Sequence, residues 1–152
     1  MKKVCDFTLL NDYGEEVKAK DLAAWTGRQS PWRTFDATGY CWYVEGERFF
    51  CRKAAYWVEL PDSSGFICFY DNLSNDNCSL LDVYGRKRFR LAVPCELTPY
   101  EVPSGAEMWF RNIGNHPDGR FGVTAWIEYA GDFYFELDYH AGRFLWGKEI
   151  RF

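Results

Sequence analysis

The acids near the C-terminus have a spacing that suits two-carboxylate chemistry. Glu136 and Asp138 are two residues apart in the stretch FYFELDY. On a strand, residues two apart point to the same face, with side-chain origins about 7 Å apart. That separation overlaps the range in which two acids hydrolyse glycosides, so a carboxylate-based hydrolase is one hypothesis. The alternative is a solvated strand face, where this spacing is common.

Cysteine and histidine could supply nucleophiles or metal ligands. The six cysteines stand at positions 5, 41, 51, 68, 78 and 95, and the two histidines at 116 and 140. No CxxC pair occurs, so the spacing does not predict a zinc site. GxSxG, HExxH, P-loop and GxGxxG motifs are also missing. We therefore predict no catalytic residues, no metal site and no cofactor, and we expect the cysteines to be reduced core residues.

One pair of cysteines can be placed by local geometry. In the stretch CWYVEGERFFC, a two-residue turn at Glu45 and Gly46 would pair Cys41 with Phe50 and Tyr40 with Cys51. Side chains alternate between the two faces of a strand, so Cys41 and Cys51 would point to opposite sides of the sheet. The sequence therefore predicts no disulfide between them.

The elements that must position these residues are strands. Short runs rich in Tyr, Trp, Phe and Val alternate with Gly, Asn, Asp and Pro clusters, a pattern typical of strands and turns. Strands are predicted at 7–10, 40–44, 48–52, 55–60, 65–70, 78–83, 88–93, 107–113, 121–129, 133–139 and 143–150, with one short helix near 19–26. We expect residues 1–152 to form a single all-β or β-dominated domain, an antiparallel meander closing toward a sandwich or barrel.

A short sequence motif that recurs three times is interpreted as a turn, or corner, between strands. LLNDYG begins at Leu9, LLDVYG at Leu80 and the looser LDYHAG at Leu137. The spacing is uneven, which does not fit a repeat architecture. Turn chemistry favours the same few residues wherever a strand reverses, so each copy predicts a turn. The basic run RKRFR at 86–90 is expected to protect the edge of a strand from pairing.

The charge and apolar pattern limit the partners and the compartment. The net charge is −4, which disfavours a general nucleic-acid binder and allows a partner with a basic surface. No apolar run has the length of a signal-peptide core or of a membrane span. The sequence therefore predicts a cytoplasmic protein that binds neither nucleic acid nor membrane.

The C-terminal strands predict a candidate binding surface. With a turn at Ala130 and Gly131, one mainly apolar face would hold Trp126, Glu128, Phe133, Phe135 and Leu137. The opposite face would hold Ile127 together with five residues that we predict to contact a partner: Tyr129, Asp132, Tyr134, Glu136 and Asp138. Tyrosines supply rigid contact area, and acids steer a basic partner. A merely solvated sheet face is the alternative.

In size, acidity and lack of catalytic motifs, the whole chain resembles the immunity proteins of bacterial toxin systems. These are small cytosolic proteins that neutralise a cognate toxin domain, often by covering its active site. The resemblance implies a non-catalytic domain that binds a partner protein stoichiometrically, such as a toxin domain with a basic surface. Two other classes stay open. One is a β-barrel with an aromatic-lined mouth for a small ligand, and the other is the carboxylate-based hydrolase.

Overall fold

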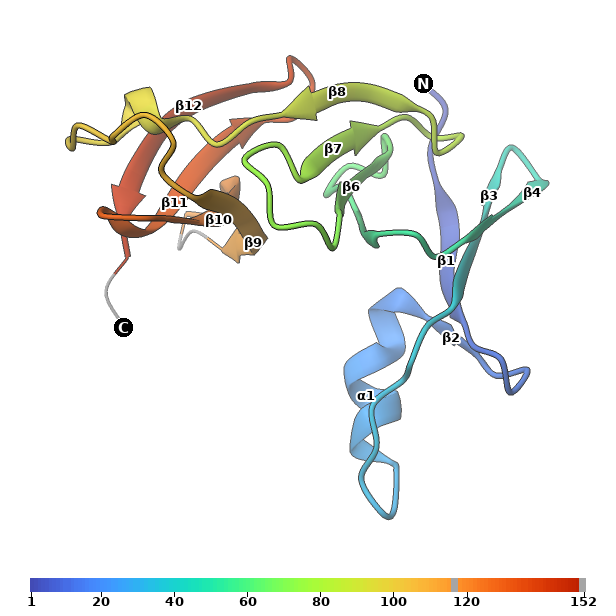
Figure 1. Cartoon of the computed structure of the whole chain (residues 1–152). Helices are drawn as coiled ribbons and strands as arrows, with labels where there is room; N and C mark the ends of the chain where they lie inside the picture. Colours follow the sequence, from blue (N-terminus) through green and yellow to red (C-terminus); the bar gives the residue numbers. More distant parts are fainter. Residues whose placement is uncertain (116–117, 151–152) are drawn as a thin grey trace. The chain divides into compact units, whose positions relative to one another are not determined.

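The computed structural model describes residues 1–115 and 118–150, and within them strands dominate (Figure 1). The strands form three four-stranded sheets, named A, B and C. Every strand pair whose register is described is antiparallel. Each sheet has two edge strands, so none of the sheets in this part of the chain closes into a barrel. The predicted β-dominated antiparallel fold is confirmed, and every predicted strand segment contains an observed strand.

Sheet A contains the predicted hairpin, whose second strand forms an edge of the sheet. Its order is β2-β1-β3-β4, with β1 (Cys5–Leu10), β2 (Glu16–Lys18), β3 (Gly39–Val44) and β4 (Glu47–Arg52). Glu45 and Gly46 both have positive φ, 50° and 80°, as a two-residue turn of this kind needs. Tyr40 pairs with Cys51 and Cys41 with Phe50, which confirms the predicted register. All six cysteines are free thiols in the structure.

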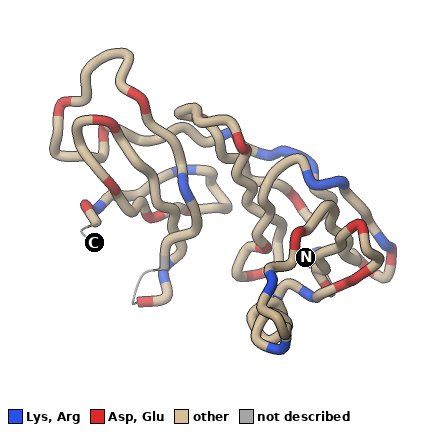
Figure 2. The backbone as a smooth tube through the Cα atoms, turned by 60° about the horizontal axis from the view of Figure 1, so that its bottom comes forward, with Lys and Arg blue, Asp and Glu red and all other residues tan. Residues whose placement is uncertain are grey.

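Sheet B has two fully buried central strands. Its order is β5-β6-β7-β8, with β5 (Tyr56–Glu59), β6 (Phe66–Phe69), β7 (Cys78–Leu81) and β8 (Lys87–Leu91). Every residue of β6 and β7 is buried, as expected for strands covered on both faces. The basic run lies on β8, an edge strand, as predicted, and it gives the chain its longest stretch of Lys and Arg (Figure 2).

Sheet C carries the candidate surface. Its order is β12-β11-β10-β9, with β9 (Met108–Asn115), β10 (Phe121–Ile127), β11 (Gly131–Asp138) and β12 (Arg143–Glu149). Ile127 pairs with Gly131 and Trp126 with Asp132, so residues 128–130 form a three-residue turn. Within this turn Tyr129 adopts a positive φ of 72°.

This register corrects the predicted faces of β10. The predicted two-residue turn at Ala130 and Gly131 was wrong. It would pair Trp126 with Phe135, but Trp126 pairs with Asp132, so the register differs by three residues, an odd number that exchanges the faces as a one-residue shift does. Ile127 therefore lies in the core, 0% exposed, on the side of Phe133 and Phe135. Trp126 lies on the opposite side with Asp132. A one-residue shift moves every side chain of a strand to the other face.

The three recurring phrases form corners of the same kind, as predicted. In the first, the Asn11 side-chain oxygen accepts hydrogen bonds from the backbone N–H groups of residues 13 and 15. In the second, Asp82 accepts from residues 84 and 86. In the third, Asp138 accepts from residues 140 and 141. A glycine with φ between 68° and 79° follows in each corner. An Asn or Asp that bonds its own backbone explains the repetition.

The helical segment projects from sheet A and is weakly packed. It comprises a 3-10 turn (Ala19–Asp21) and α1 (Leu22–Gly27), which confirms the predicted short helix. No residue of α1 is buried. We call residues 19–36, α1 and the loop after it, the arm (Figure 1). Trp25 and Phe35 meet edge to face at 5.2 Å, and Arg33 pairs with Glu15 at 2.8 Å, which also lowers the pKa of that carboxyl. The first contact lies within the arm, and the second joins the arm to the turn between β1 and β2.

The described chain divides into two compact units. Unit 1 comprises residues 1–54, 58–66 and 82–86, and unit 2 comprises residues 55–57, 67–81 and those from 87 onward. In unit 1 the ring of Phe66 packs against Phe7 at 4.9 Å and against Trp42 at 5.0 Å. In unit 2 the rings of Phe133 and Phe135 stack at 5.9 Å. That residues 1–152 fold as one domain stays a prediction, whose expected signature is a single cooperative unfolding transition.

Candidate functional site: the outer face of sheet C

The side of sheet C that faces away from its core carries an unusual concentration of tryptophan. We define the outer face of sheet C by six of the side chains that its register places there: Trp109, Trp126, Asp132, Tyr134, Glu136 and Trp146. The opposite side holds the buried residues Phe110, Ala125, Ile127, Phe133 and Phe135. This clean division follows from strand alternation on both sides of the three-residue turn.

The aromatic side chains of the outer face form two pairs. Trp109 and Trp126, on β9 and β10, lie with ring centroids 4.6 Å apart. Tyr134 and Trp146, on β11 and β12, lie 5.8 Å apart. The three tryptophans are half-buried, so part of each indole ring is accessible. Tryptophan is among the residues that contribute most to binding energy in protein interfaces.

The acids of this face are already paired with arginines. Asp132 accepts from Arg111 at 2.7 Å. Arg111 occupies a bulge of β9, where the register shifts opposite Thr124 and Ala125. Glu136 lies 3.5 Å from Arg120 and also accepts a hydrogen bond from the Trp146 indole N–H at 3.0 Å. Asp132 and Glu136 therefore each lie beside an arginine, whereas exposed Lys148, opposite Tyr134 on β12, forms no ion pair with any described residue.

Tyr134 is buried by the sheet itself. Its side chain is on the predicted face, but the residue is only 6% exposed. The ring lies over Gly114 and Gly122 of the neighbouring strands, where a Cβ on Gly114 would come within 2.6 Å of the ring. Burial raises the pKa of the Tyr134 hydroxyl, and the nearby Glu136 carboxylate raises it further. The Tyr134 ring therefore packs against the sheet and offers little accessible surface to a partner.

The five predicted contact residues occupy three places. Asp132, Tyr134 and Glu136 share the outer face, as predicted. Tyr129 lies in the β10–β11 turn and is 78% exposed. Asp138 lies at the other end of β11, where its carboxylate holds the corner before Gly142. Their role as partner contacts stays a prediction.

Sequence reasoning missed the tryptophans and arginines of this face. Trp126 was assigned to the core by the wrong turn length, and Trp109, Trp146, Arg111 and Arg120 were not singled out. One available signal was Gly114 and Gly122, which leave room for a large ring on a neighbouring strand.

A hollow of about 420 Å³ adjoins the outer face. Trp109 and Arg111 line it, together with Tyr56, Phe69, Tyr70, Asp71, Leu73, Asn77 and Phe110. Asn77, one of these lining residues, is buried and forms two hydrogen bonds with the backbone of Phe110, at 2.7 and 2.9 Å. A hollow with several aromatic lining residues and a fixed amide suits an anchoring side chain from a partner.

The acids proposed for glycoside hydrolysis have other contacts. Glu136 binds Arg120 and Trp146, and Asp138 accepts backbone N–H groups. Burial raises the pKa of the Cys68 and Cys78 thiols, which keeps them protonated. No group of three or more His, Cys, Asp or Glu suited to a metal ion occurs among residues 1–115 and 118–150. His116 lies outside the described residues, and no described helix is long and apolar enough to span a membrane.

Comparison with known proteins identifies a shared fold. No protein-family model matches this sequence, and no curated protein matches it. Among solved structures, the fold is similar to a chain of the structure titled "Structure of Tne2 in complex with Tni2". The TM-score is 0.65 at 12% sequence identity, and the match covers 97% of this chain and 99% of that chain. At this identity the likeness shows the fold alone.

Proposed function

We propose that this protein is a non-catalytic domain that binds one partner protein stoichiometrically. The observation that carries the proposal is the fold likeness, which spans 97% of this chain and 99% of a chain from a structure titled as a complex of Tne2 with Tni2. The match runs almost end to end, so the likeness concerns the whole fold and not one part of it. A binding role is therefore the function that the fold supports best.

The outer face of sheet C is the surface we propose for this role. Half-buried tryptophans beside arginines have the composition of an interface centre. The neighbouring hollow, at about 420 Å³, offers room for an anchor residue. Exposed Tyr129 extends the surface at one end.

The charge of the partner follows from the paired acids. Asp132 and Glu136 are neutralised by Arg111 and Arg120, which are themselves about half exposed at 53% and 45%. We propose that basic groups of the partner displace these arginines and take over the two carboxylates. This exchange keeps each acid paired in the complex, which avoids an uncompensated buried charge.

The more specific proposal is an immunity protein of a bacterial toxin system that acts in the cytoplasm. Its general character supports this assignment: small size, a net charge of −4 and a fold without recognisable catalytic motifs. In this function the outer face of sheet C would cover the toxin domain that it neutralises. Growth rescue tests it: cells producing the captured partner should stop growing, and co-production of this protein should restore growth.

The binding proposal is tested by capture from a lysate of the native host, followed by calorimetry on the purified pair. We expect a one-to-one complex, and we expect Trp126→Ala to weaken it about 30-fold, equivalent to about 2 kcal/mol. Trp32→Ala is the matched control, because Trp32 is 71% exposed on the arm. Capture of no stoichiometric partner would contradict the function. Binding that depends on Trp32 instead of Trp126 would contradict only the placement.

The charge exchange has its own test on the same pair. Arg111→Ala should strengthen binding several-fold, because Asp132 becomes available without losing an internal partner. Reversal of charge at Asp132, Glu136 and Asp138 should weaken binding at least tenfold. Unchanged affinity in both variants would show that the partner does not use these acids.

A further inference from the structure

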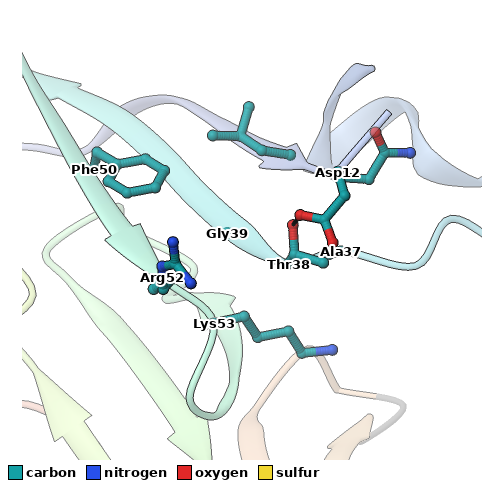
Figure 3. A pocket seen from close by; sticks show the side chains of 9 residues that line it. Asp12, Ala37, Thr38, Gly39, Phe50, Arg52 and Lys53 are labelled. Carbon is teal, nitrogen blue, oxygen red and sulfur yellow. Dashed lines mark hydrogen bonds between the residues drawn. The ribbon is translucent and has the colours of Figure 1, made fainter. Parts of the chain in front are cut away.

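Unit 1 contains a second hollow, separate from the surface proposed for the partner protein. Its volume is about 490 Å³. It is lined by the end of β1 and the following turn, by the residues that lead into β3 and by the end of β4: Leu10, Asn11, Asp12, Ala37, Thr38, Gly39, Phe50, Arg52 and Lys53. Figure 3 shows Phe50, Arg52 and Lys53 along one side and Asp12 with Thr38 on the other.

Two cations at this hollow lack a carboxylate partner. Arg52 and Lys53 are exposed, and neither forms an ion pair with any described residue. By contrast, Arg33, Arg86, Arg90, Arg111 and Arg120 each have an acidic partner. Two adjacent unpaired cations favour an anion from solution, and the concave wall strengthens the attraction.

An exposed aromatic ring lies beside these cations. Phe50 is 60% exposed, although it sits in the middle of β4. Gly39 on β3 leaves the space that the ring needs, since a Cβ there would lie 3.2 Å from the edge of the Phe50 ring. The ring and the half-buried Leu10 give the hollow an apolar side next to its charged side.

Hydrogen bonds hold the walls of the hollow in place. The Thr38 N–H donates to the Leu10 carbonyl at 2.7 Å, and the Lys53 N–H donates to the Thr38 carbonyl at 2.9 Å. The Thr38 hydroxyl donates to the Asp12 carboxylate at 3.0 Å. All three lining segments are therefore tied to one another. The lining has two positive charges and one negative charge, which favours a singly charged anion.

We propose that this hollow binds a carboxylate attached to a flat apolar group. Arg52 binds the carboxylate in a two-pronged geometry, Lys53 adds a point charge, and Phe50 stacks on the apolar group. The site does not depend on the proposed partner protein. It gives the protein a second, small-molecule binding activity with a defined ligand class.

The test is an NMR titration of the full chain with benzoate. We expect amide shifts confined to the lining segments and a Kd of about 1–10 mM, the range for a ligand of this size. Acetate lacks the ring and benzamide lacks the charge, so each should bind at least fivefold more weakly. Benzoate shifts that are absent, or that acetate and benzamide reproduce equally, would overturn the proposal.

Variants locate the site without disturbing the core. Arg52→Met and Phe50→Ala should each weaken benzoate binding at least fivefold, while Arg28→Met, an exposed arginine outside the hollow, should leave it unchanged. The melting temperature of each variant shows that it is folded. Equal affinity in all three folded variants would overturn the assignment of these residues.

A second probe distinguishes two sources of the same chemistry. N-acetyl-Gly-Phe ends in a free carboxylate beside a phenyl ring. Tighter binding of this peptide than of benzoate would identify a peptide C-terminus as the ligand. Exclusion of the peptide while benzoate binds would identify a small free acid. Either result supports the site, and failure of both probes to bind overturns it.

Discussion

The hairpins β3–β4 and β10–β11 present opposite kinds of surface. On β10–β11 the acids Asp132 and Glu136 have arginine partners, and Tyr134 fills the space over Gly114 and Gly122. On β3–β4 the cations Arg52 and Lys53 have no acidic partner in the described residues, and Phe50 stands exposed over Gly39.

This contrast indicates how a small β protein can have two different binding modes. Carboxylates that lie beside arginines, with half-buried rings around them, let a large partner cover the surface without isolating those carboxylates. Unpaired cations in a hollow attract a small charged group instead. The two surfaces should therefore respond to mutation in different ways.

The largest expected difference concerns the glycines. A Cβ on Gly122 would collide with the Phe135 carbonyl oxygen and the Tyr134 ring, whereas one on Gly39 meets mainly the exposed Phe50 ring at 3.2 Å. Gly122→Ala should lower the free energy of unfolding by about 3 kcal/mol or more, and Gly39→Ala by about 1 kcal/mol or less. Urea unfolding followed by tryptophan fluorescence measures both. Equal losses would show that the two faces are packed alike.

A smaller difference should appear at alkaline pH. Burial raises the pKa of the Tyr134 hydroxyl in the folded protein above its ordinary value. Its contribution to stability is therefore complete below about pH 10, the unfolded pKa, and is lost as pH rises through the folded pKa. Tyr134→Phe should gain stability relative to the unmodified protein between pH 9 and 11. Urea unfolding across this range, with Tyr56→Phe as the exposed control, tests the sign. A constant difference would contradict a buried hydroxyl.

The smallest expected effect is the contribution of the Arg111–Asp132 ion pair to the free energy of unfolding. Both side chains contact solvent, at 53% and 24% exposure, so the pair should add only about 0.5 kcal/mol to stability. A double-mutant cycle with Arg111→Ala and Asp132→Ala measures the coupling, which should fall further in high salt. A coupling above about 2 kcal/mol would mean that the pair is too strong for a partner to exchange.

The fold could be predicted from the sequence where a turn is short. Glu45 and Gly46 both adopt positive φ in a two-residue turn, so the register of β3–β4 could be predicted from the sequence alone. At β10–β11 the glycine at 131 suggested the same turn. Gly131 does have a positive φ, but Tyr129 has one too, which a tyrosine rarely adopts, and the turn comprises residues 128–130. That single conformation moved Trp126 out of the core.

The candidate surfaces depended on contacts that spacing does not encode. Asp132 meets Arg111 only because β9 has a bulge, and Glu136 meets Arg120 from the far end of β10. The hollow beside Phe50 joins three segments far apart in the sequence. Alternation along β11 could be predicted, because it needs only the strand itself. The partners across the sheet could not.

The absence of buried residues in α1 has a consequence for where the chain can be labelled or cleaved. The arm should open locally at little cost, so its amide hydrogens should exchange with solvent long before those of β1 and β3. Trypsin should cut first after Arg28, while β1, before the cut, remains hydrogen-bonded to β3, after it. The arm is thus the natural place to insert a label or to open the chain into two pieces that stay together.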